Sequence, residues 1–208
     1  MQSNYNTKKK LLQGFLALVC ATITNLALAA PPNTTYIGLD IGGSRSGIDT
    51  AKAFSELSIM PGSTFSEDDN AKLAGRIYAG IQVNDYIAPE FGYTLLSSTG
   101  FHVTQPNGVT TAGSIKQQAF DLVLVGTAPL EYFDLYAKAG GVILNNIAKY
   151  NDQHVNEWKY GFKFGVGINT EIDNVRLKLG WDRIQKTGVS RNINFVYVGA
   201  SYYFFTLG

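Results

Sequence analysis

The sequence lacks several features that would assign it to a common class of protein. It has one cysteine, Cys20, and two histidines in 208 residues. So few of these residues exclude a disulfide framework and a metal site built from clustered cysteines and histidines. Lysine and arginine number 17 against 16 aspartates and glutamates, so no excess of charge points to nucleic acid as a partner. No feature of the sequence predicts a cofactor.

Residues 1–30 predict a signal peptide that is cleaved after export. A basic run from Lys8 to Lys10 precedes an apolar stretch that ends in small residues around Ala29. This order is typical of Sec-dependent export, and the stretch is too short for a membrane anchor. Cys20 lies inside it, so the exported chain would carry no cysteine, which fits a bacterial envelope protein. We expect residues 31–205 to form one domain and residues 206–208 a short tail.

Long apolar runs are also missing after the leader, where no stretch approaches the roughly 20 apolar residues of a membrane helix. Segments of about ten residues take their place, in which every second residue is apolar. The clearest covers residues 158–168, where aromatic and aliphatic residues alternate with lysine and glycine. This period of two predicts β-strands. Similar segments cover residues 34–43, 72–84, 87–95, 117–127, 133–143 and 175–182, and an eighth begins near Asn194.

The connections between these segments alternate in length. Long connections are expected at about residues 44–70, 97–114, 145–156 and 185–192, with short turns between them. Short turns on one side and long loops on the other predict an all-β fold. We expect an eight-stranded antiparallel up-and-down transmembrane β-barrel with long extracellular loops and short periplasmic turns. Both termini would then lie on the periplasmic side.

The charged face of each strand is expected to point inward. The apolar faces carry almost no charge and hold aromatic residues near strand ends, as lipid-facing girdles do. A soluble ligand-carrying barrel, the alternative, would bury the apolar face and expose a glycine-rich one. Because unpaired buried charge is costly, we expect the interior charges to pair, and eight strands leave no room for a wide channel. The predicted lumen charge network comprises Asp40, Arg76, Glu90, Asp121, Lys138, Lys163, Arg176, Lys178 and Asp182.

Six motifs, taken in order, resemble the OmpA-like transmembrane-domain family, which includes OmpX-like and opacity-type proteins. They are GLDIGG, PEFGYTL, PLEYFDLYAKAGG, GFKFGVGI, DNVRLKLGWD and VGASYYF. The resemblance covers nearly the whole exported chain. It implies a small barrel in the outer membrane of a Gram-negative bacterium, in contact with lipid and lipopolysaccharide, and we expect a monomer.

The resemblance also implies roles for particular residues. Glu90, Lys138 and Arg176 match lumen positions that pair in the family, whereas Val125 and Gly167 stand where further partners would be expected. Family members usually end at an aromatic residue that the barrel-assembly machinery reads. Here Tyr202 and Phe204 share the lipid face of the last segment and are the predicted assembly signal.

The sequence favours a non-enzymatic protein that contributes to envelope integrity and contacts host surface molecules through its outer loops. One alternative is an enzyme that modifies lipid or lipopolysaccharide in the outer leaflet, using His102 or His154. Ser97 and Ser98 lie near His102, with Glu90 lower on the same segment, but no G-x-S-x-G elbow supports this reading. The other alternative is a narrow pore. The first long loop has a net charge of −3 over residues 44–70 and could meet a basic surface.

Overall fold

The computed structural model describes residues 34–48, 60–67, 71–150, 153–185 and 190–204. The predicted signal peptide, the tail at 206–208 and most of the first long loop lie outside these residues. No helix in the described part of the chain is long and apolar enough to cross a membrane. The strands are β1 (Thr34–Ile48), β2 (Thr64–Glu67), β3 (Lys72–Gln82), β4 (Ile87–Thr104), β5 (Thr110–Pro129), β6 (Asp134–Tyr150), β7 (Gln153–Ile172), β8 (Val175–Gln185) and β9 (Ser190–Phe204).

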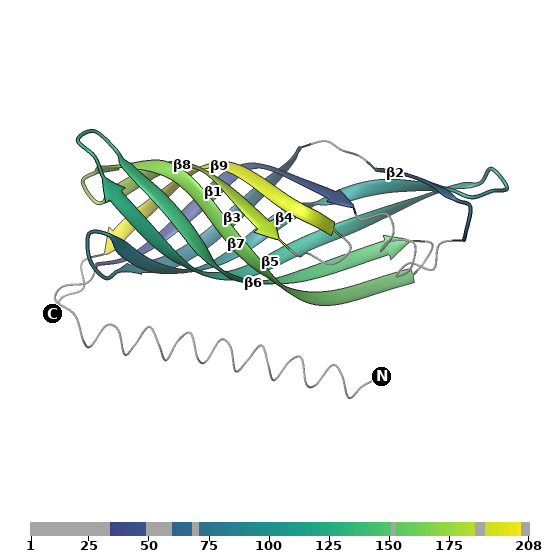
Figure 1. Ribbon diagram of the computed structural model, residues 1–208, viewed down its shortest axis with the longest axis horizontal. Coiled ribbons are helices and arrows are strands. Elements are labelled where there is room, and N and C mark those ends of the chain that lie inside the picture. The colour runs from purple at the N-terminus through teal and green to yellow at the C-terminus, as the bar shows by residue number, and fades with distance from the viewer. Residues whose placement is uncertain (1–33, 49–59, 68–70, 151–152, 186–189, 205–208) are drawn as a thin grey trace, which may run out of the picture.

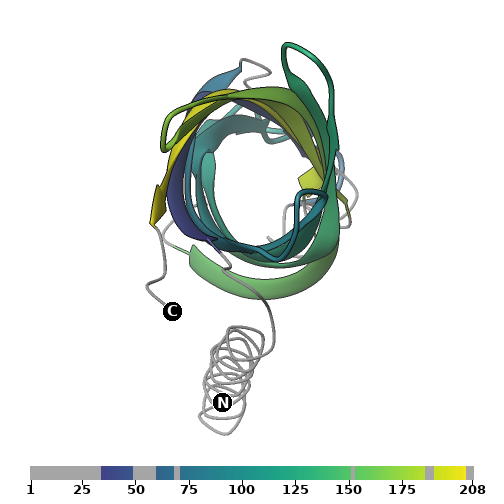
Figure 2. The same ribbon diagram turned by 90° about the vertical axis from the view of Figure 1, so that its left-hand side faces the viewer.

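Eight of these strands, β1 and β3 to β9, form a closed antiparallel barrel. Each pairs with the next along the chain, and β9 pairs with β1 to close the ring (Figure 2). The closing register sets Thr35 opposite Phe204 and Asp40 opposite Gly199. The predicted eight-stranded up-and-down barrel is confirmed.

The strands turn their apolar side chains outward and their charged side chains inward. On β1, for example, Leu39 is 50% exposed, whereas its neighbour Asp40 is fully buried. The same alternation around the ring leaves a broad apolar outer surface, the arrangement of a barrel that faces lipid. Its exposed aliphatic residues include Ile37, Leu39, Ile41, Ile77, Leu95, Leu124, Val166, Ile168, Leu177, Leu179, Val196 and Val198.

One end of the barrel, the short-turn end, carries three tight connections and the ends of β1 and β9. These connections are residues 83–86, 130–133 and 173–174. The backbone amide of Tyr203 donates to the carbonyl of Asn174 at 2.9 Å, which ties the last strand to the β7–β8 turn. Figure 1 shows this end on the left.

At the opposite end, four strands continue past the barrel. β4 pairs with β3 only as far as Leu96 but runs on to Thr104, about 26 Å further at roughly 3.3 Å per residue. With β2 and the upper parts of β5, β6 and β7, it forms what we call the extended sheet, whose β4–β5 hairpin projects furthest in Figure 1.

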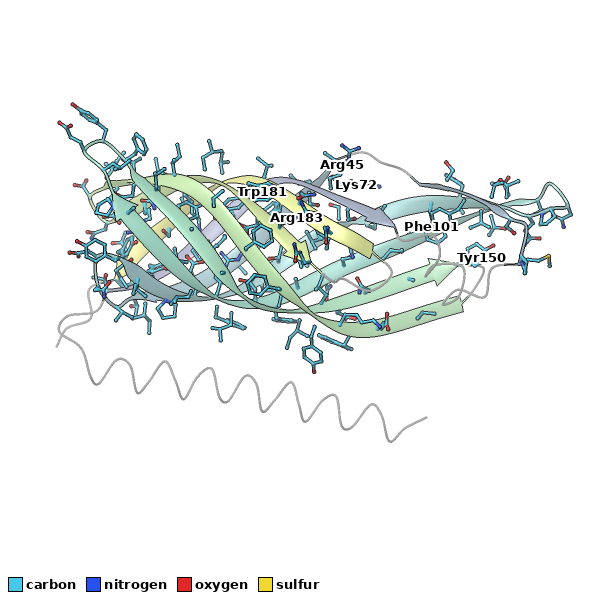
Figure 3. All side chains as sticks on the ribbon, viewed as in Figure 1. Arg45, Lys72, Phe101, Tyr150, Trp181 and Arg183 are labelled. Atoms are coloured by element: carbon cyan, nitrogen blue, oxygen red, sulfur yellow. The ribbon has the colours of Figure 1, made fainter. Side chains whose placement is uncertain are left out.

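The extended sheet occupies much of the second and third connections that the sequence predicted as loops. Its strands continue because apolar residues keep recurring on the inner face beyond the barrel. A register shift between Leu96 and Thr99 rephases β4 so that this face is maintained. Figure 3 shows Phe101 and Tyr150, whose rings stack at 6.1 Å, in this region. The buried cluster comprises Phe101, Val103, Ile115, Ala148 and Tyr150, with Phe65 and Val155 packed against it.

Candidate functional site

The centre of the barrel interior holds a compact cluster of charges around Arg76. This guanidinium is fully buried and lies 2.7 Å from Asp121, 2.9 Å from Glu90 and 3.5 Å from Asp40. The four residues come from β3, β5, β4 and β1, where alternation turns each toward the interior. Three carboxylates around one guanidinium leave an excess of negative charge, which three lysines offset.

The lysines complete the cluster from the other side of the barrel. Lys163 bridges Asp121 at 3.0 Å and Asp182 at 3.1 Å. Lys138 lies 2.9 Å from Asp182, and Lys178 lies 3.3 Å from Asp40. The cluster therefore contains four carboxylates and four cations, and its formal charges balance. Buried ion pairs are retained only with such close partnering, because desolvation of each charge is costly.

Eight of the nine residues predicted for the network meet in this cluster, and Arg176 lies apart from them. Its guanidinium Nε donates to Glu171 at 2.7 Å, and Nη1 approaches Gln82 Oε1 at 3.4 Å. It also lies over the ring of Tyr203, 4.9 Å from the centroid. Arg176 thus sits at the short-turn mouth because it comes only one residue after the start of β8.

Tyrosines form a second part of the interior, for which the sequence analysis predicted no role. Tyr197 accepts a hydrogen bond from Lys138 at 2.8 Å and donates to Asp182 at 3.1 Å. Tyr36 donates to Glu90 at 3.1 Å, and Lys178 lies 3.7 Å from the ring centroid of Tyr78. Apart from Tyr150 in the extended sheet, the buried tyrosines of the described residues are Tyr36, Tyr78, Tyr136, Tyr197 and Tyr203.

The inward position of two of these tyrosines could have been predicted from the glycines opposite them. Tyr78 pairs with Gly38 and Tyr36 pairs with Gly80 across the same two strands. Each ring lies over its glycine in the space that a Cβ would fill. A tyrosine and a glycine that face each other on the inward side therefore predict a ring lying flat across the interior.

Toward the extended sheet the interior becomes apolar, a layer that the sequence analysis did not predict. The inward positions of the strands there carry aliphatic and aromatic residues instead of charges. Above this layer, Gln117 donates to Asn146 at 2.9 Å. The layer closes the barrel over the charge cluster with packed hydrocarbon. It consists of Ala74, Leu96, Ala119, Val142, Leu144, Ile184, Ile193 and Phe195, with Tyr197 at its base.

On the short-turn side of the charges lies a cavity of about 20 Å³. Its walls include Tyr78, Glu90, Lys138 and Lys178. A space of this size holds about one water molecule. The described interior is therefore filled by side chains, as expected for eight strands.

The structure separates His102 from Glu90, the acid considered with it for catalysis. His102 is exposed on β4, in the extended sheet, and Glu90 lies twelve residues away in the interior, about 40 Å along the strand. The Ser97 hydroxyl donates to the carbonyl of Leu73. His154 lies on β7, in register with Lys149. Both histidines therefore occupy strands rather than the loops predicted for them.

Comparison with known proteins gives the family. Residues 14–204 match the family described as outer membrane protein beta-barrel domain. The chain belongs to this family. No curated protein matches the sequence.

Solved barrels of similar fold come from several bacteria. Ail, the attachment invasion locus protein of Yersinia pestis, is 15% identical, with a TM-score of 0.53 over 84% of this chain and 100% of that one. Neisserial surface protein A is 13% identical, with a TM-score of 0.57 over 82% and 97%. OprG from Pseudomonas aeruginosa is 11% identical, with a TM-score of 0.54 over 85% and 98%. At these identities the likeness establishes the fold.

Membership of this family places the protein in the bacterial outer membrane. Barrels of this kind have short periplasmic turns and longer extracellular loops, so we expect the short-turn end in the periplasm and the extended sheet outside the cell. Tyr202 and Phe204 face outward near the periplasmic rim, 47% and 48% exposed. Their rings meet edge to face at 5.0 Å. They have the position expected of an assembly signal, and that role stays a prediction.

Proposed function

We propose that this protein is a non-enzymatic outer-membrane barrel that supports envelope integrity and binds an anionic molecule of the host surface through its extended sheet. The filled interior supports the first part, because the described side chains pack across the barrel from wall to wall. The extended sheet supports the second part. Its inner face is packed around Phe101, so its outer face is held in a fixed shape.

The observation that carries the proposal is a pair of lysines on that outer face. Lys116 on β5 and Lys149 on β6 are both exposed. Ser114 is the direct partner of Lys149, and Lys116 lies two residues further along the same face. The two lysines are therefore diagonal neighbours, with Cα atoms about 7–8 Å apart. Exposed His102 lies on the same face, opposite Ala112.

Two fixed cations at this spacing suit a polymer with closely spaced sulfate or carboxylate groups. Ail of Yersinia pestis has been solved in complex with the heparin analogue sucrose octasulfate, and that structure has a TM-score of 0.50 and 14% identity to this chain. By analogy with that barrel, we infer a sulfated polysaccharide as the class of partner for the Lys116–Lys149 face.

Binding of the protein in phosphatidylcholine nanodiscs to immobilised heparin tests the proposal. The Lys116→Gln, Lys149→Gln double variant is expected to bind about tenfold more weakly, since each exposed charge contact contributes up to about 1 kcal/mol. Lys72→Gln is the matched control, because Lys72 lies at the barrel rim (Figure 3) and should leave binding unchanged. Equal binding by the double variant and the wild type, or no binding by either, would overturn the proposal.

A further inference from the structure

A groove of about 500 Å³ lies on the outer surface of the barrel where the β7–β8 turn meets the end of β9. It is separate from both the filled interior and the extended sheet. Its volume falls in the range of pockets that hold small ligands. Six residues line it: Ile172, Asp173, Asn174, Val175, Leu177 and Tyr202.

The apolar wall of this groove belongs to the lipid-facing surface. Ile172 pairs with Val175, and Val175 pairs with Tyr202, so the three side chains form a row across neighbouring strands. Leu177 lies one step higher on the same face. Because the row is at the short-turn end, the groove lies at the level of the periplasmic leaflet, where acyl chains meet headgroups.

The polar end of the groove is held in place by the turn. Asp173 has a positive φ of 54°, a conformation that Asp and Asn adopt more readily than most residues. The hydrogen bond from the Tyr203 amide to the Asn174 carbonyl fixes the turn against β9. The turn that carries Asp173 and the apolar wall are thus parts of one preformed surface.

The charge of the lining decides what can occupy it. Asp173 is the one formally charged residue among the six, and it is negative. The nearby guanidinium of Arg176 is directed to Glu171 and the ring of Tyr203. An anionic headgroup would be repelled here, whereas an ammonium group beside Asp173 would form a charge-assisted hydrogen bond.

We propose that this groove binds a phospholipid of the periplasmic leaflet with a primary-amine headgroup. Its ammonium group pairs with Asp173, and one acyl chain lies along Val175, Leu177 and Tyr202. Tyrosine at the edge of such a site suits the interface, because its ring is apolar and its hydroxyl polar. The inference stands apart from the extracellular function proposed above.

Native mass spectrometry of the detergent-solubilised protein with equal amounts of phosphatidylethanolamine and phosphatidylglycerol tests the proposal. We expect the wild type to retain phosphatidylethanolamine preferentially and Asp173→Asn to lose roughly three- to tenfold of that preference. Asparagine accepts the same φ, so the turn should stay intact. The matched control is Asp85→Asn, which removes an exposed carboxylate from the β3–β4 turn and should keep the preference.

Two further results would overturn the assignment. The first is an equal preference in the wild type and Asp173→Asn, or no preference in the wild type. The second is displacement of the lipid by free phosphoethanolamine at the same concentration, because that would show an amine site without a role for the acyl chain. Heat-dependent migration on gels confirms that each variant is folded before it is compared.

Discussion

Arg76 on β3 reaches across β4 to Asp121 on β5, with Nη2 2.7 Å from Oδ1. The strand between them presents Gly92, which is in register with Tyr78 on one side and Asp121 on the other. A Cβ on Gly92 would lie 2.5 Å from the guanidinium Nε. The shortest ion pair of the central cluster therefore depends on the absence of a side chain at Gly92 on the intervening strand.

Gly92→Ala is expected to destabilise the barrel by about 1–3 kcal/mol, because Arg76 must move away from partners that hold it on several sides. Urea unfolding in lipid vesicles, followed by tryptophan fluorescence, measures this free energy. Gly141→Ala is the control, since nothing lies within 4 Å of its added Cβ and its change should stay within about 0.5 kcal/mol. Equal stabilities of the two variants would contradict the role of Gly92.

Arg76→Met should cost more, about 3–5 kcal/mol, because it leaves Asp40, Glu90 and Asp121 buried with less compensating charge. The same unfolding measurement applies. Lys159→Met removes a cation whose ion pair with Glu157 is partly exposed, and it should cost about 1 kcal/mol or less. A loss at Arg76 no larger than at Lys159 would mean that the cluster does not stabilise the fold.

Planar-bilayer recordings of the purified protein should show no discrete conductance steps. Within the described part of the barrel, the apolar layer around Leu144 and Phe195 and the balanced charges beneath it fill the interior. A porin of known conductance, reconstituted under the same conditions, serves as the positive control. Reproducible steps from the wild type would restore the narrow-pore alternative.

Cells that produce the His102→Ala, His154→Ala double variant should have the same lipid A as cells with the wild-type protein. The physical reason is that His102 lies far along β4 from Glu90, the acid considered with it. Mass spectrometry of extracted lipid A makes the comparison, with cells lacking the protein as a reference. A modification that disappears in the double variant would establish the enzymatic alternative.

Phe204→Ala should impair assembly into the outer membrane, whereas deletion of residues 205–208 should leave it intact. Phe204 shares the lipid face with Tyr202, so it is the last aromatic residue in the correct phase. The folded fraction in membranes, measured by heat-modifiable migration, tests both changes. Val198→Ala, on the same face but higher on β9, is the control. Loss of assembly on truncation would mean that the assembly signal lies within residues 205–208.

The barrel itself was predictable because a single physical constraint acts on every residue of a spanning strand. Side chains of a spanning strand alternate between lipid and interior. The inward direction of Asp40 and the outward direction of Leu39 could therefore be assigned from their alternating positions alone. Alternation carries less information beyond the membrane. Phe101 and Ile115 continue the same inward pattern, but their strands were predicted to end early because polar residues between them resemble loop sequence.

Depth along the barrel axis was the harder quantity to predict. The odd or even position of a residue places Arg176 and Asp182 on one face, but it does not show that Arg176 stays at the mouth while Asp182, six residues further along β8, lies in the central cluster. Ile184 and Phe195 are inward residues that look lipid-facing by type, so the apolar layer was missed. Contacts in the interior depend on the stagger between strands, which sequence periodicity does not contain.

The contacts of the charge cluster depend on this stagger between strands. Seven of the eight barrel strands contribute a charge to the cluster, and the eighth, β9, contributes Tyr197, which hydrogen-bonds to Lys138 and Asp182. A strand that slipped by two residues would still direct the same apolar side chains to lipid, so contact with the membrane would not disfavour the slip. The slip would nevertheless displace an interior charge by about 7 Å and separate it from partners now within 3.5 Å. The interior contacts therefore favour the correct register of the ring over registers shifted by two residues, which bury the same apolar surface in lipid.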